Sequence, residues 1–284
     1  MENSIKKRIC LYDNLKFLLI IFVVVGHFAD IFTAKSSFCK SVFIFIYAFH
    51  MPLFIFISGQ FNRNEKVLNR ILKYLAIGFL LKIILAICSS ILNGSIPSFK
   101  LLSDSGIPWF MFALAAFTGI SHVLKDVDKK YILISSIVLA CFVGYDSSIG
   151  DYLYLSRIIV FYPFYVLGEI INKDKIVEIS KNNWIKIIAL MIIIIWAIVS
   201  FKFLNKVYFL RPLFTGRNPF NSNNVFLKYG PLYRILCYLL SCIIGCSFIS
   251  IIPNKKIALI TKFRRKNIAS IFLALASCQT TNEI

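Results

Sequence analysis

Long apolar segments alternate with short polar ones along the whole chain, a pattern typical of membrane-spanning helices. A helix needs about 17 to 25 predominantly apolar residues to cross a hydrocarbon core of about 30 Å. This pattern predicts eight spans, near residues 14–33, 42–60, 70–92, 107–124, 131–145, 153–172, 184–204 and 231–252. The chain is therefore predicted to be all-α: a polytopic transmembrane helical bundle, forming a single integral-membrane domain over residues 1–284.

Composition agrees with this prediction, and the distribution of charge adds an orientation. Of the 284 residues, 58% are hydrophobic, more than a soluble domain of this length needs. The net charge of +19 could indicate a nucleic-acid partner, but the Lys and Arg residues collect in short loops after the second, fourth, sixth and eighth spans. Under the positive-inside rule such loops are cytoplasmic. The N-terminus is therefore predicted to be cytoplasmic, and no nucleic acid is expected as a partner.

The cysteines do not form a recognisable site. They are scattered and lie mostly in apolar segments, at Cys10, Cys39, Cys88, Cys141, Cys237, Cys242, Cys246 and Cys278. None of them shows the C-x-x-C spacing of a metal or redox site. Neither a disulfide framework nor a bound metal is predicted.

Ionisable residues inside the predicted spans are the first candidates for function. His27 lies in the first span, His50 in the second and Glu169 in the sixth. A polar group in hydrocarbon is costly unless it faces the bundle interior, so such residues mark functional sites by default. His50 is followed by Pro52, which removes a helical hydrogen bond and predicts a bend there. Lys16 precedes His27 by eleven residues on the same helix face, about 16 Å along the axis.

Several ordered motifs resemble the membrane acyltransferase-3 family, in particular its branch similar to fucose 4-O-acetylase. The segment Tyr12–Lys16 is followed by an apolar run that ends in Gly26-His27, and then by Phe49–Phe54 and Ser58-Gly59. Each element is common by itself, whereas the order and spacing are more specific. Many family members have Arg where this chain has Lys16, which keeps the charge but loses a planar, bidentate donor.

The resemblance continues through most of the chain. Later matching elements are Arg70–Tyr74, Ile107–Leu114, Phe161–Gly168, Tyr233–Leu236 and Ile251–Lys256. Near residue 264 the chain departs from the family pattern, because the last hydrophobic helix with its Leu-His is missing. The resemblance therefore implies eight to ten spans and a C-terminus that is truncated or frameshifted after about residue 264.

Family resemblance implies transfer of an acyl group, usually acetyl from acetyl-CoA, to a sugar hydroxyl of a cell-surface polysaccharide or its precursor. A hydroxyl is a weak nucleophile, and a histidine can remove its proton or carry the acyl group briefly. His27 is the first candidate for this role. The alternative is a buried histidine satisfied by a neighbouring helix. His50 is the second candidate, and it could equally anchor the bend before Pro52.

The donor site requires cations for the phosphates of CoA. Lys16, Arg70 and Lys73 lie at the predicted cytoplasmic ends of the first and third spans and are the predicted donor-binding residues. The alternative is that they only follow the positive-inside rule.

The acceptor site is expected to combine an aromatic platform with charged groups. Trp109, Arg157 and Glu169 are the predicted substrate-binding residues. Trp109 could also belong to the aromatic belt at the membrane interface, and Glu169 could form an i,i+4 pair with Lys173.

The sequence therefore predicts an O-acetyltransferase of the bacterial inner membrane, with the bilayer, acetyl-CoA and a glycan acceptor as partners. A transporter or flippase is the alternative from another class, because intramembrane His and Glu residues also form proton relays and substrate paths. A third alternative is an inactive, truncated acyltransferase.

Overall fold

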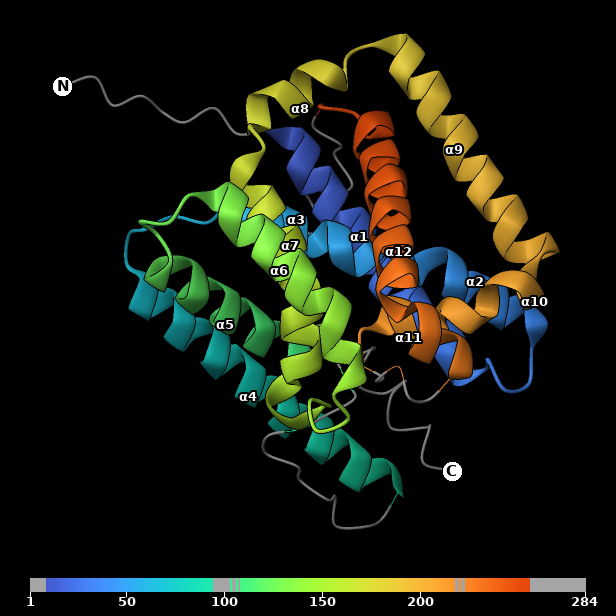
Figure 1. Ribbon diagram of the computed structural model, residues 1–284, viewed down its shortest axis with the longest axis horizontal. Coiled ribbons are helices and arrows are strands. Elements are labelled where there is room, and N and C mark those ends of the chain that lie inside the picture. The colour runs from blue at the N-terminus through green and yellow to red at the C-terminus, as the bar shows by residue number, and fades with distance from the viewer. Residues whose placement is uncertain are drawn as a thin grey trace.

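The computed structural model describes residues 9–93, 103, 106, 108–217, 220 and 223–255, and the regular elements in this part of the chain are all helices. Figure 1 shows them as a bundle around α1, α3, α7 and α12. The bounds are α1 (Cys10–Ile31), α2 (Ser37–Tyr47), α3 (His50–Gln60), α4 (Val67–Asn93), α5 (Trp109–Val123), α6 (Lys129–Phe142), α7 (Leu155–Ile170), α8 (Lys173–Ile179), α9 (Asn183–Lys202), α10 (Leu204–Val207), α11 (Arg211–Thr215) and α12 (Asn224–Ile251). The predicted all-α class is confirmed.

Six helical segments in the described residues are long and apolar enough to cross a membrane. They are Cys10–Ile31, Ser37–Gln60, Val67–Cys88, Tyr152–Ile170, Asn183–Lys202 and Asn224–Ile251. The other two predicted spans are also helical, but α5 has 15 residues and α6 has 14, short of the roughly 20 that a crossing requires. The predicted departure from the family pattern near residue 264 lies outside the described residues.

Side-chain caps fix where several helices begin. A Ser, Asp or Asn side chain accepts a hydrogen bond from a first-turn N–H group, which satisfies a donor that has no partner within the helix. This happens at Ser36 before α2, Asp128 before α6, Asn172 before α8, Asn182 before α9 and Asn223 before α12. Each cap follows a loop, so the turns between helices are specified locally.

α3 and α7 pack closely against each other, and two glycines permit this approach. A Cβ on Gly59 would overlap the backbone carbonyl of Tyr165 in α7, and a Cβ on Gly168 would overlap the carbonyl of Phe56 in α3. Both helices are largely buried in the bundle. Any other residue at these positions would force α3 and α7 apart.

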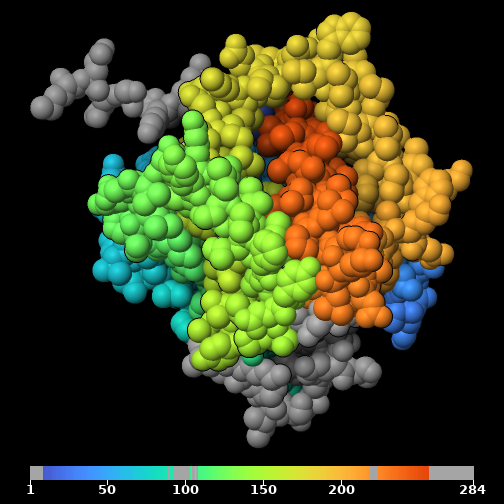
Figure 2. Space-filling model, in the orientation of Figure 1, coloured from blue at the N-terminus to red at the C-terminus, as the bar shows by residue number. Residues whose placement is uncertain are grey.

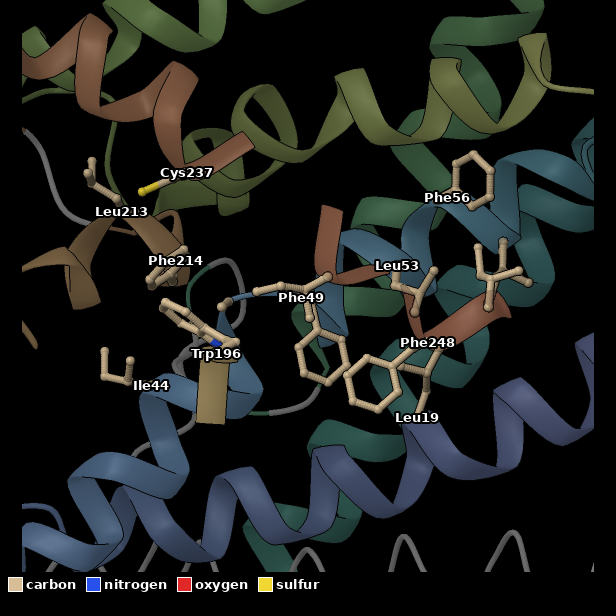
Figure 3. Packing of buried hydrophobic residues seen from close by; sticks show 14 of the residues in the cluster. Leu19, Ile44, Phe49, Leu53, Phe56, Trp196, Leu213, Phe214, Cys237 and Phe248 are labelled. Carbon is tan, nitrogen blue, oxygen red and sulfur yellow. The ribbon is translucent and has the colours of Figure 1, made fainter. Parts of the chain in front are cut away.

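Large apolar side chains fill the space between α1, α3, α9 and α12. The ring of Phe49 stacks on that of Phe248, with 4.2 Å between centroids (Figure 3). Trp196 of α9 donates from Nε1 to the carbonyl of Phe45 over 3.2 Å. On the face drawn in Figure 2, α6 meets α12 and α9 lies on the outer flank. Most side chains of α9 remain exposed, as expected of a helix whose outer face contacts lipid.

The bundle has two ends, which we name after residues of α1. At the Lys16 end lie the start of α1 and the end of α12, and the Asn14 side-chain amide donates to the carbonyls of Pro253 (2.8 Å) and Lys255 (3.0 Å). At the His27 end lie the end of α1 and α11, joined by an ion pair of 2.7 Å between Asp30 and Arg211. The candidate site residues divide between these two ends.

Candidate functional site

One aromatic ring, that of Tyr47, links the two predicted catalytic histidines. Tyr47 at the end of α2 lies between them, with centroid distances of 6.4 Å to His27 and 4.8 Å to His50. Gly26 makes this approach possible, because a Cβ there would lie only 3.2 Å from Cε2 of Tyr47. His27 is half-buried, whereas His50 is 2% exposed. The structure thus brings together two histidines that are remote in the sequence.

Hydrogen bonding fixes the tautomer of His50. Its Nδ1 lies 2.9 Å from the carbonyl oxygen of Ile46. A carbonyl oxygen only accepts hydrogen bonds, so Nδ1 carries the hydrogen and Nε2 keeps its lone pair. His50 can therefore act as a base through Nε2.

The predicted bend at Pro52 is confirmed, and it places His50 at the start of a new helix. α2 ends at Tyr47 and α3 begins at His50, with Pro52 in the first turn of α3, where a missing N–H group is tolerated. In a continuous helix the carbonyl of Ala48 would accept from position 52. Here it accepts from the hydroxyl of Ser241 in α12. The kink is therefore held by a contact with another helix.

Arg157 and Trp109 form a second group at the His27 end. The Arg157 guanidinium carbon lies 4.9 Å from the ring centroid of Trp109, and Arg157 is 3% exposed. Trp109 stacks in turn on Phe161, at 5.7 Å. Two of the three predicted acceptor-binding residues are thus neighbours of each other.

Sequence reasoning missed the charged residues that surround this group. Asp151 forms ion pairs with two arginines: its Oδ1 lies 3.6 Å from Nη2 of Arg157, and its Oδ2 lies 2.5 Å from Nη2 of Arg217. Arg211, which pairs with Asp30, also lies over the ring of Phe43 at 4.9 Å. These residues lie at or beyond the ends of the apolar segments, and the side chains of Asp30, Asp151, Arg211 and Arg217 are about one third exposed, so their sequence positions gave no signal of a site.

Lys82 was also missed, although the sequence contained a signal for it. It lies in the middle of α4, is 3% exposed, and approaches the rings of Phe112 (5.7 Å) and Tyr154 (5.6 Å). A lysine inside an apolar span is costly for the same reason as a histidine. Tyr154 adopts a left-handed backbone conformation, with φ +59°, directly before α7.

At the Lys16 end, two lysines share one aromatic ring. Nζ of Lys16 lies 4.2 Å and Nζ of Lys173 lies 4.3 Å from the ring centroid of Phe61. The hydroxyl of Tyr12 donates to Gln60 over 3.0 Å, which fixes the end of α3 beside α1. Three elements therefore bring two ammonium groups close together.

Glu169 lies at this Lys16 end, far along α7 from Arg157. Its Oε1 accepts from Asn62 Nδ2 over 2.5 Å, and its Oε2 lies 2.8 Å from Nζ of Lys129. Asn62 Oδ1 accepts from Arg70 over 2.9 Å. Lys73, the third predicted donor-binding residue, is exposed one turn further along α4.

Glu169 and Lys173 do not lie on one helix, as the suggested i,i+4 pair would require. α7 ends at Ile170, and Ile171 has an extended backbone with ψ 129°. Lys173 therefore begins a new helix, and i,i+4 geometry on one helix is lost.

A pocket of about 530 Å³ opens beside Glu169. This volume is typical of small-molecule sites. Its lining comprises Gly59, Gln60, Asn62, Arg63, Asn64, Lys125, Lys129, Gly168, Glu169, Ile170, Ile171, Asn172, Lys173 and Asp174. Four of these residues are cationic and two are acidic, so the pocket suits an anionic ligand. Among the described residues, no group of three or more His, Cys, Asp or Glu side chains could hold a metal ion.

Comparison with known proteins agrees with the sequence motifs. The model of the acyltransferase-3 family, described as an acyltransferase domain, matches residues 12–274. Nodulation protein NolL of Sinorhizobium fredii (strain NBRC 101917 / NGR234) is 26% identical over 239 residues, which are 77% of this chain and 60% of NolL. The chain thus spans less than two thirds of the length of this curated relative. No solved structure matches it.

Proposed function

The chain belongs to the acyltransferase-3 family, and on this premise we propose that it is a membrane O-acetyltransferase that transfers acetyl from acetyl-CoA to a sugar hydroxyl. The acceptor is a cell-surface polysaccharide or its precursor, and the enzyme acts in the bacterial inner membrane. The observation that carries this proposal is the group His27–Tyr47–His50 inside the matched domain. It supplies a base inside the helical bundle.

The reaction needs one proton acceptor. The sugar hydroxyl oxygen forms a bond to the carbonyl carbon of the thioester, and the bond from that carbon to sulfur breaks. A histidine takes the hydroxyl proton, and the proton then passes to the CoA thiolate. His50 offers a fixed Nε2 lone pair, and His27 lies on the other side of Tyr47. Either ring can hold the proton while the other orients the acceptor.

The donor binds at the Lys16 end in this proposal. Lys16, Arg70 and Lys73 supply cations for the phosphates, and the pocket beside Glu169 adds further cations from three loops. The positive-inside rule makes this end cytoplasmic, where acetyl-CoA is available. About 16 Å separates Lys16 from His27 along α1, so one extended donor molecule can reach from the phosphate site to the histidines.

The acceptor binds at the His27 end. In this proposal Trp109 and Arg157, which are buried beside each other, line the acceptor site, and Arg157 supplies hydrogen-bond donors. Glu169, which the sequence suggested for the acceptor, lies at the donor end, and its ion pair with Lys129 does not involve the histidines. This separation also weakens the alternative of a transporter with a His–Glu proton relay.

Mass spectrometry of the surface glycan tests the proposal. Cells that express this chain should show acetyl-sized mass increments that mild base removes. Cells that express His27→Ala should not show them, although the protein is inserted in equal amount. Base-labile acetylation that persists in the variant would contradict the assignment of His27. Its absence in both strains would contradict the acetyltransferase proposal.

A further inference from the structure

Glu169 is one of the two acidic residues that line the cationic pocket. Its side chain is 9% exposed, and its two oxygens contact groups from two directions: Asn62 after α3 and Lys129 at the start of α6. Through Asn62 the contact extends to Arg70 in α4. One carboxylate thus links cations that belong to two different helices.

Backbone packing holds this carboxylate in place. The preceding residue, Gly168, lies against the carbonyl of Phe56 in α3. α7 ends one residue after Glu169, so the side chain projects at the end of a helix that cannot shift without separating α3 from α7. The carboxylate of Glu169 therefore has a fixed position. The flexible side chain of Lys129 contacts it directly, and that of Arg70 contacts it through Asn62.

An isolated acid beside a phosphate site would be unfavourable, because it repels the anionic ligand. Asp174 lines the same pocket and repels an anionic ligand in this way. Its side chain is exposed to solvent. Glu169 differs from Asp174 because it pairs with Lys129 at 2.8 Å and is connected to Arg70 through one hydrogen-bonded side chain. The two acids of the pocket should consequently have opposite effects on anion binding.

We propose that Glu169 is a positioning residue of the donor site: its carboxylate holds Lys129 at the pocket wall and, through the lining residue Asn62, is connected to Arg70, and these cations bind the phosphates of the acyl donor. This inference rests on the proposed function, because it takes CoA as the ligand. Preorganised cations bind an anion more tightly because fewer side-chain rotamers are lost on binding. The fixed carboxylate therefore improves phosphate binding despite its own negative charge.

The test compares two variants that each remove one negative charge from the pocket. In the purified full chain, Glu169→Gln should raise the Kd for CoA about tenfold, because Lys129 loses its fixed partner while Gln still accepts from Asn62. Asp174→Asn should lower the Kd, because it removes a negative charge that repels the phosphates. Titration calorimetry with CoA in lipid nanodiscs measures both. Equal or tighter CoA binding by Glu169→Gln would overturn the proposal.

Kinetics and a second variant separate positioning from a merely structural role. With Glu169→Gln, the KM for acetyl-CoA should rise about tenfold, whereas kcat should change much less. Lys129→Met should weaken CoA binding similarly, and adding Glu169→Gln to it should cause no further loss. Unchanged CoA binding by Lys129→Met would also overturn the proposal, whether or not the Glu169 variant folds.

The same measurements distinguish this inference from the proposed function. A wild-type chain that neither binds CoA nor transfers acetyl overturns the proposed function, and the inference with it. A wild-type chain that does both, with Glu169→Gln behaving like Asp174→Asn, overturns the positioning inference alone.

Discussion

Gly59 and Gly168 lie where α3 and α7 cross, and each lacks the Cβ that would overlap the other helix. α3 carries His50 at its start, and α7 carries Arg157 near its start and Glu169 near its end. The spacing of these two helices therefore determines how the histidine group, the aromatic platform and the cationic pocket lie relative to one another.

Gly168→Ala should lower the free energy of unfolding by about 1–3 kcal/mol, because the added methyl group overlaps the Phe56 carbonyl and α3 must move. Thermal unfolding in detergent measures the change. Gly150→Ala is the matched control, because a Cβ at position 150 meets nothing within 4 Å. Equal stability of the two variants would show that the crossing is looser than described.

Ser241→Ala should also destabilise the protein, by about 1–3 kcal/mol, because the buried carbonyl of Ala48 loses its donor. The kink before Pro52 would then relax and shift His50, so transfer activity should fall as well. Ser247→Ala is the control, because Ser247 donates only to a carbonyl of its own helix. A Ser241 variant as stable and active as the Ser247 variant would contradict this role.

His50→Asn should reduce acetyl transfer by about 10²-fold or more, because Asn can still donate to Ile46 but has no basic nitrogen. The folded amount in the membrane should stay the same. The control is His122→Asn at the exposed end of α5, which should transfer acetyl at the normal rate. Radiolabel transfer from acetyl-CoA to the glycan fraction measures both, and an active His50→Asn would limit His50 to a structural role.

Trp109→Ala should raise the KM for the acceptor about tenfold or more and leave the KM for acetyl-CoA unchanged, because the platform beside Arg157 is lost. The control is Trp184→Ala, since Trp184 is 75% exposed at the start of α9. The measurement is the initial rate at varied concentrations of glycan extracted from the same cells. A larger effect on the donor than on the acceptor would place Trp109 elsewhere in the reaction.

Much of the fold could be predicted because apolar length is visible in the sequence: each of the eight predicted spans contains a helix. The histidine group could be anticipated for a related reason, since an imidazole in an apolar run is costly wherever the helix packs. The same cost applies to the ammonium group of Lys82 inside the third predicted span, so Lys82 is also marked as a candidate for function.

The partners of Glu169 could not be predicted in this way. Its pairing with Lys129 depends on how the start of α6 meets the end of α7, and the bridge through Asn62 depends on the crossing of α3 with α7. Local spacing instead suggested Lys173, which lies beyond the end of the helix. Contacts between helices depend on how the helices pack, and the residue spacing within one segment does not determine that packing.

The hydrogen bonds of Asn14 with Pro253 and Lys255 also constrain the order of biogenesis. α1 leaves the ribosome before α12, yet the acceptors of its buried amide are made only after α12 has been translated. Until then the Asn14 amide must donate its hydrogen bonds to water or to a temporary acceptor in the translocation machinery. The buried amide of α1 thus reaches its final hydrogen-bonded state only after the last of the described helices has been made.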